Sequence, residues 1–314
     1  MSYRQRLPQL DGDFFLTDGG IEITLMFLEG LELPDFAAFD VLRRTDGEAP
    51  LKKYFRSYAA LAQRFGTGLI LESPTWRASA DWGARLGYGA AELAEANRRA
   101  VGLLEQIRDE LRGHPKAIVI SGCVGPRGDG YQPARTMSAQ QAEAYHTPQI
   151  QTFRDTAADM ITAITMNYVE EAVGIVRAAR RSGLPVAISF TVETDGRLPT
   201  GQTLQSAIEH VDAATSRAPA YYMVNCAHPT HFEDVLRGAA PWVQRIRGVR
   251  ANASRKSHAE LNESSELDIG DPTELGAQHA RLTRRLPHLT VMGGCCGTDV
   301  RHVAQIAAAC LRSR

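Results

Sequence analysis

Short apolar segments recur along the chain, and longer amphipathic segments separate them. Eight of the apolar segments are rich in β-branched residues and are apolar on both faces. That pattern is typical of strands in a parallel sheet that is covered by helices. The predicted strands begin at Phe14, Thr67, Ala117, Asp159, Pro185, Tyr221, Ile246 and Leu289.

The intervening segments have the periodicity of helices. Residues 90–113 carry apolar side chains every three to four residues, and Gly113 is a suitable C-cap. Residues 169–185 begin with acidic residues and end with basic ones, followed by Gly183 and Pro185, which is the expected order of helix signals. Eight such alternations predict an α/β fold, a (β/α)8 TIM barrel, formed as one domain over residues 1–314. A doubly wound open sheet is the alternative, but no G-x-G-x-x-G motif follows the first strand.

Composition narrows the function classes. The 314 residues include 35 Lys+Arg and 36 Asp+Glu, so the formal net charge of -1 provides no broad basic surface for nucleic acid or an anionic membrane. The first fifteen residues do not resemble a signal peptide, and no apolar run approaches the ~20 residues that span a bilayer. We therefore expect a cytoplasmic protein. Its five cysteines, an odd number, are expected to be reduced.

Three of these cysteines stand at the carboxyl ends of predicted strands. Cys226 ends the sixth strand, and the adjacent Cys295 and Cys296 end the eighth. The carboxyl ends of all barrel strands lie on one rim, where such folds place their chemistry. Three thiolates could therefore meet at one point, although about seventy residues separate them. The alternative is that they are buried apolar side chains.

The adjacency of two of these cysteines imposes a geometric condition. Neighbouring side chains in a regular strand point to opposite faces, so the strand must end at or before Cys295 and the backbone must bend. Gly293, Gly294 and Gly297 would permit that bend. A disulfide between the neighbours would need a strained ring.

Three sulfur ligands suit Zn²⁺, which is usually tetrahedral. Three protein ligands leave a fourth position open, as in a catalytic site. A thiol bound there would lose its proton and become the nucleophilic thiolate.

Other candidate ligands have simpler interpretations. Cys123, in a predicted strand-end loop, and Cys310, in a helix, are expected to pack in the interior. His228 and His231 follow Cys226 closely, but Pro229 indicates a loop and a first helical turn there, with His228 near the pocket as an alternative. Asn252, which follows the seventh strand, could equally line the pocket or form a turn.

Several motifs together resemble the zinc-dependent homocysteine S-methyltransferase family. The most specific is GGCCGT at residues 293–298, and Asn225–Cys226 matches the position of the third ligand. TDGGIEITL at residues 17–25 and GCVGPRGDGY at residues 122–131 resemble the family's opening turn and its third-strand loop. The resemblance extends over nearly the whole chain.

The resemblance implies a (β/α)8 barrel in which Cys226, Cys295 and Cys296 bind zinc. It further implies that the Asp18-Gly19-Gly20 turn, Thr75 and Asn225 lie at the substrate. The Asp18 carboxylate could pair with the ammonium group of the substrate; alternatively, Asp18 is an ordinary turn residue. The alternative for Thr75 is that its hydroxyl caps a helix.

The implied reaction transfers a methyl group from an onium donor, which is S-methylmethionine, another sulfonium or betaine, to a thiol. Homocysteine would be the acceptor and methionine the product, a step of methionine biosynthesis. Alternatives are another thiol or selenol acceptor, or a non-catalytic barrel that binds zinc and thiols. The partners are small molecules, and a homo-oligomer is compatible with the sequence.

Two positions depart from the family pattern. Ile164 stands where a glutamate near the substrate amino group is usual, and no other acid replaces it in that strand end. Arg77 stands where betaine-type members tend to have tyrosine. Its cation could face a substrate carboxylate or be solvated, and solvation is the interpretation we favour.

Overall fold

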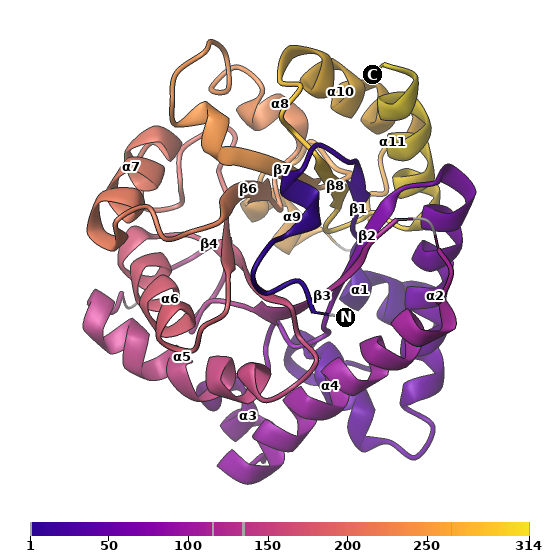
Figure 1. Cartoon of the computed structure of the whole chain (residues 1–314), viewed down its shortest axis with the longest axis vertical. Coiled ribbons are helices and arrows are strands. Elements are labelled where there is room, and N and C mark those ends of the chain that lie inside the picture. The colour runs from indigo at the N-terminus through magenta and orange to yellow at the C-terminus, as the bar shows by residue number, and fades with distance from the viewer. Residues whose placement is uncertain (1, 115, 134–135, 265, 314) are drawn as a thin grey trace.

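The computed structural model describes residues 2–114, 116–133, 136–264 and 266–313. Its strands form one closed parallel barrel in which each strand pairs with the next and β8 pairs with β1 (Figure 1). The strands are β1 Phe15–Leu16, β2 Gly68–Glu72, β3 Ile118–Val124, β4 Met160–Met166, β5 Val186–Phe190, β6 Tyr221–Asn225, β7 Ile246–Ala251 and β8 Val291–Gly294. All eight predicted strands are present, and the prediction of a (β/α)8 barrel is confirmed.

Long helices surround this barrel on its outside, and several short helices accompany them (Figure 1). They are α1 Ile21–Ile23, α2 Glu48–Phe65, α3 Ala80–Arg85, α4 Ala90–Glu110, α5 Ala139–Arg154, α6 Val169–Arg181, α7 Leu204–Thr215, α8 Pro229–Phe232, α9 His258–Glu263, α10 Pro272–Arg285 and α11 Val300–Arg312, with short turns of other helix types at Pro8–Leu10, Thr24–Leu28, Pro34–Phe36, Ala38–Arg43 and Val243–Arg245. The predicted helices at 90–113 and 169–185 correspond to α4 and α6. Gly113 lies three residues beyond α4 and has a left-handed backbone, with a φ of 95°.

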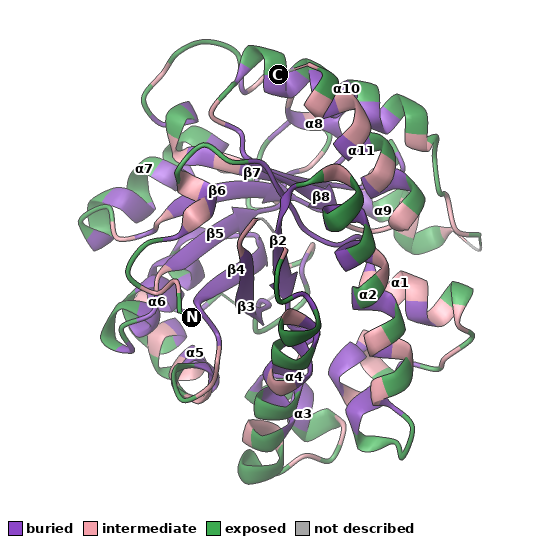
Figure 2. Ribbon diagram, turned by 45° about the vertical axis from the view of Figure 1, so that its right-hand side comes forward, coloured by how far each residue is buried: buried purple, intermediate pink, exposed green. Residues whose placement is uncertain are grey.

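The strands are buried on both faces, as their uninterrupted apolar sequences predicted (Figure 2). Outward-facing side chains of the strands and the inner faces of the helices form the main hydrophobic core. Within the described residues, no helix has the length and apolar character needed to span a membrane.

The chain's first residues close the amino-terminal end of the barrel. Leu7 is buried there, and Tyr3 and Leu10 pack on the same inward-facing cluster as Phe15. In Figure 1 this indigo segment crosses the centre of the ring of strands. A charged anchor fixes it, because the carboxylate of Asp159 accepts a hydrogen bond from the amide of Tyr3 at 2.9 Å. A functional site is therefore expected at the opposite rim, formed by the carboxyl ends of the strands.

Candidate metal centre

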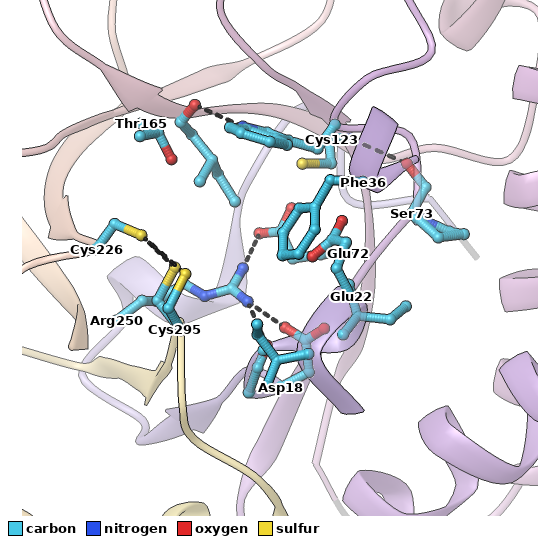
Figure 3. Close-up of a pocket in the computed structure, with 18 of the residues that line it drawn as sticks. Asp18, Glu22, Phe36, Glu72, Ser73, Cys123, Thr165, Cys226, Arg250 and Cys295 are labelled. Atoms are coloured by element: carbon cyan, nitrogen blue, oxygen red, sulfur yellow. Dashed lines mark hydrogen bonds and ion pairs between the residues drawn. The ribbon is translucent and has the colours of Figure 1, made fainter. Parts of the chain in front are cut away.

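Three cysteine sulfurs meet at the carboxyl rim of the barrel (Figure 3). Cys226 follows the last residue of β6, and Cys295 and Cys296 follow the last residue of β8. Sγ of Cys226 lies 3.4 Å from that of Cys296 and 3.1 Å from that of Cys295. All three sulfurs lie within 4.8 Å of one another, so they can contact a single ion.

The backbone leaves strand geometry where the cysteines begin. Cys226 has a φ of 56°, in the left-handed region that a residue with a side chain rarely adopts. Such backbone strain is characteristic of functional sites. On the other strand, β8 ends at Gly294, as the predicted vicinal arrangement requires.

The three glycines around Cys295 and Cys296 are required for different structural reasons. Gly297 has a φ of 76° and makes the turn after the cysteines. Gly293 and Gly294 lie inside the strand, where a Cβ atom would collide with Thr17 and Thr298 respectively. The expectation that all three glycines serve the bend is thus wrong for two of them, because close packing of neighbouring side chains requires their missing Cβ.

The cluster has the donor set and the electrostatics of a metal site. The pKa of Cys295 is well below its usual range, because its sulfur shares hydrogen bonds with the other two thiols and the Arg250 guanidinium lies nearby. Cys295 is therefore the most readily deprotonated of the three cysteines, and the thiolate is the form that binds metal. Three convergent cysteines fit a zinc ion.

Neighbouring polar groups fix the backbone of the three cysteines. Oδ1 of Asn252 accepts a hydrogen bond from the amide of Cys296 at 3.0 Å, which assigns Asn252 to the turn rather than to the pocket wall. Nε2 of His258 lies 2.6 Å from the carbonyl oxygen of Cys226. These contacts hold the sulfurs in place before any ligand binds.

Tyr131 covers the cluster and was missed by the sequence analysis. Its hydroxyl lies 2.8 Å from Sγ of Cys226 and 3.8 Å from Sγ of Cys296. Its ring stacks on His258 with centroids 4.0 Å apart. The only signal in the sequence was its place in the long polar loop after the third strand.

The cluster forms one wall of a cavity at the rim. Its lining includes the predicted turn Asp18-Gly19-Gly20. Asp18 is buried, forms an ion pair with Arg250 and accepts a hydrogen bond from the Tyr54 hydroxyl at 3.0 Å. Arg250, the penultimate residue of β7, also lines the cavity and was not predicted.

Two predicted substrate residues lie behind the cavity lining. The Thr75 hydroxyl is fully buried and donates to the carbonyl oxygen of Cys123 at 2.8 Å, so it ties the loop after β2 to β3. Asn225 is also fully buried, and its Oδ1 accepts from the amide of Thr165 at 3.0 Å. Its Nδ2 lies 3.9 Å from Sγ of Cys295, which places it beside the sulfur cluster.

Two glutamates that the sequence analysis did not select also line the cavity. Glu72 ends β2, and Glu22 lies in α1 directly after the Asp18-Gly19-Gly20 turn. Burial raises the pKa of each carboxyl group to about 7. Ile164 lines the same cavity as an uncharged side chain.

The structure also places four other residues that the sequence singled out, which are Arg77, Cys123, His228 and Cys310. Arg77 is half-buried rather than freely solvated: its guanidinium stacks on the Trp82 ring at 3.8 Å and donates to the carbonyl oxygen of Asp35 at 2.8 Å. Cys310 is buried in α11, as expected. Cys123 is also buried, but it lies within β3 and lines the cavity. His228 caps α8, because its ring accepts a hydrogen bond from the amide of Thr230.

A second cavity adjoins the first on its outer side. The two share Phe36, Trp76 and Tyr131, together with Cys296. The outer cavity is further lined by carboxylates, among them Asp129. The sulfur cluster can therefore be approached past aromatic rings.

Comparisons with known proteins agree with this geometry. The family model described as homocysteine S-methyltransferase matches residues 15–310. The homocysteine S-methyltransferase YbgG of Bacillus subtilis is 25% identical over 247 residues, which cover 71% of this chain and 74% of that protein. The metallated form of the homocysteine methyltransferase MmuM from Escherichia coli superposes with a TM-score of 0.71 at 18% identity, covering 96% of this chain and 98% of that chain. Its oxidized form gives 0.72 at 19% identity, covering 96% and 99%. These two likenesses establish the fold.

Proposed function

The chain belongs to the homocysteine S-methyltransferase family, and from that premise we propose that it transfers a methyl group from an onium donor to the thiol of homocysteine, with zinc as its metal. The products are methionine, the demethylated donor and a proton. S-methylmethionine, another sulfonium or betaine would serve as the donor. The observation that carries the proposal is the convergence of three cysteine sulfurs on the wall of a cavity at the barrel rim.

Cys226, Cys295 and Cys296 would hold the zinc. When bound, zinc would keep the acceptor thiol in its thiolate form, which is the nucleophile. Asn252 and His258 contribute by fixing the backbone of two of these cysteines, because preorganised ligands lose little freedom on binding.

The remaining residues would bind and orient the two reactants. Aromatic faces attract cations, so Phe36, Trp76 and Tyr131 would guide the positively charged donor to the cluster. The sulfur–methyl bond forms as the bond between the methyl carbon and the onium centre breaks, and the donor leaves with the electron pair. Because the donor is already a good leaving group, positioning and exclusion of water are the main tasks of the chain.

The test is mass spectrometry of the products from a matrix of thiols and methyl-onium donors, with zinc-loaded protein. We expect methionine from homocysteine and at least one onium donor. Tight binding of zinc and thiols without a methylated product from any pair would overturn the proposal and favour a binding protein.

A further inference from the structure

The inner cavity holds more negative than positive groups. Among its described lining residues, Asp18, Glu22 and Glu72 are acidic, and Arg250 is the one basic residue. Arg250 forms its close ion pair with Asp18. One guanidinium therefore faces three carboxyl groups, and two of those lack an equivalent partner.

Glu72 is almost fully buried and only partly compensated. Its side chain is 4% exposed, and its Oε1 lies 3.9 Å from Nη1 of Arg250, which is beyond hydrogen-bond distance. Its Oε2 is buried and makes no hydrogen bond within the described residues. An unpartnered buried carboxyl oxygen is unfavourable unless a ligand supplies a donor.

Glu22 provides a second carboxyl group beside the first. Glu22 forms no ion pair in the described part of the chain, and its carboxyl group, which lines the cavity, bonds to its own backbone amide alone. Figure 3 shows Glu22 and Glu72 together, across the cavity from the sulfurs and with Arg250 between. A zinc ion bound by three thiolates would carry a net charge of about −1 and would leave both glutamates uncompensated.

The part of the cavity wall that β4 forms carries no negative charge that could bind a cation. At the end of β4 the lining residues are Ile164 and Thr165, and neither is ionisable. A ligand with a thiol and, a short chain away, an ammonium group could place the thiol at the sulfur cluster and the ammonium group at the two glutamates.

We propose that Glu22 and Glu72 bind the α-ammonium group of the acceptor and so select amino acid thiols over thiols that lack an amine. This inference rests on the proposed methyl transfer and names the determinants of acceptor specificity in the same site. It assigns to α1 and β2 the charge partner that Ile164 does not provide. The two glutamates act on the acceptor, not on the cationic methyl donor.

The test compares homocysteine with 4-mercaptobutanoate, which has the same chain but no amine. Wild type, Glu22→Gln and Glu72→Gln are loaded with zinc, and Glu32→Gln removes an exposed charge from the same N-terminal region as a control. Isothermal titration without donor gives the affinity for each thiol. Steady-state kinetics with S-methylmethionine or betaine give kcat and KM for both reactants.

We expect wild type and Glu32→Gln to favour homocysteine by at least ~100-fold in affinity, because a site built for an N–H group rejects analogues without it. Each of the other two variants should lose most of that preference while binding 4-mercaptobutanoate as wild type does. Equal weakening of both thiols, or a change confined to the KM of the donor, would overturn the inference. Absence of any methylated product would refute the proposed reaction, whereas the titrations still decide the inference. If Glu72→Gln does not fold, Glu22→Gln decides it.

Discussion

The hydroxyl of Tyr131 lies 2.8 Å from Sγ of Cys226, although 95 positions separate the two residues in the sequence. The contact joins the loop after β3 to the residue after β6. It places a phenol hydroxyl over the sulfur cluster at the point where the inner and outer cavities meet. The contact therefore connects the sulfur cluster with the passage between the two cavities.

Replacing Cys226 by serine should abolish both zinc binding and methyl transfer. Loss of one of three sulfur ligands is expected to weaken zinc by more than the ~10–100-fold typical of changes to outer groups. Elemental analysis and product formation measure the two effects. Cys310→Ala, in the buried face of α11, is the matched control and should keep zinc. Turnover by Cys226→Ser protein that contains no stoichiometric zinc would contradict the mechanism.

Replacing Tyr131 by phenylalanine should retain the fold and weaken zinc binding by about tenfold, because the hydroxyl that contacts Cys226 and Cys296 is lost. Competition with a chromophoric chelator measures the affinity. Tyr88→Phe removes a hydroxyl that bonds to Asp40, away from the cluster, and should leave zinc affinity unchanged. An unaltered affinity in Tyr131→Phe would show that the contact has no role in metal binding.

Replacing Gly294 by alanine should disturb the metal centre through packing alone. The added Cβ would collide with the side chain of Thr298, so the end of β8 must shift. We expect a loss of about 1–3 kcal/mol in the free energy of unfolding, together with less than stoichiometric zinc. Gly102→Ala, where a Cβ meets nothing within 4 Å, is the control and should be neutral or stabilising. A stable, fully metallated Gly294→Ala protein would refute this account of the glycine.

Replacing Glu72 by glutamine should change how stability depends on pH. Burial raises the pKa of Glu72 in the folded protein to about 7, above its usual value of 4.5. Between these values folding takes up a proton, so this group's contribution to stability is complete below about pH 4.5 and falls as the pH rises to 7. The glutamine variant lacks this decline.

The stability of Glu72→Gln relative to wild type should therefore rise by about 2 kcal/mol between pH 5 and pH 8. Urea unfolding of the metal-free proteins at both pH values measures the change, with Glu32→Gln as the control. A difference that stays constant with pH would show that Glu72 is ionised in the folded protein throughout this range.

The sequence predicted the barrel well because the information is local. Each strand is an apolar run bounded by polar turns, so its position could be read from neighbouring residues alone, and β6 and β7 begin where predicted, at Tyr221 and Ile246. The rule that carboxyl ends share one rim then brought Cys226 near Cys295 without any knowledge of the structure.

The rest of the site depends on which loop folds over which strand. Tyr131 reaches the cluster because its loop crosses the rim, and no spacing in the sequence encodes that path. Arg77 was misjudged for a similar reason, since the Trp82 ring that covers it is supplied by α3. A usable signal did exist for Glu72 and Arg250, because a charged residue near the end of a buried strand needs a partner or a ligand.

The closed amino-terminal end of the barrel has a kinetic consequence. With Leu7 and its neighbours sealing that end, both reactants must arrive, and both products must depart, through the one remaining rim. A molecule seated in the inner cavity then stays there while the outer cavity is filled. We therefore expect the two reactants to bind in a fixed order, the acceptor first and the donor second.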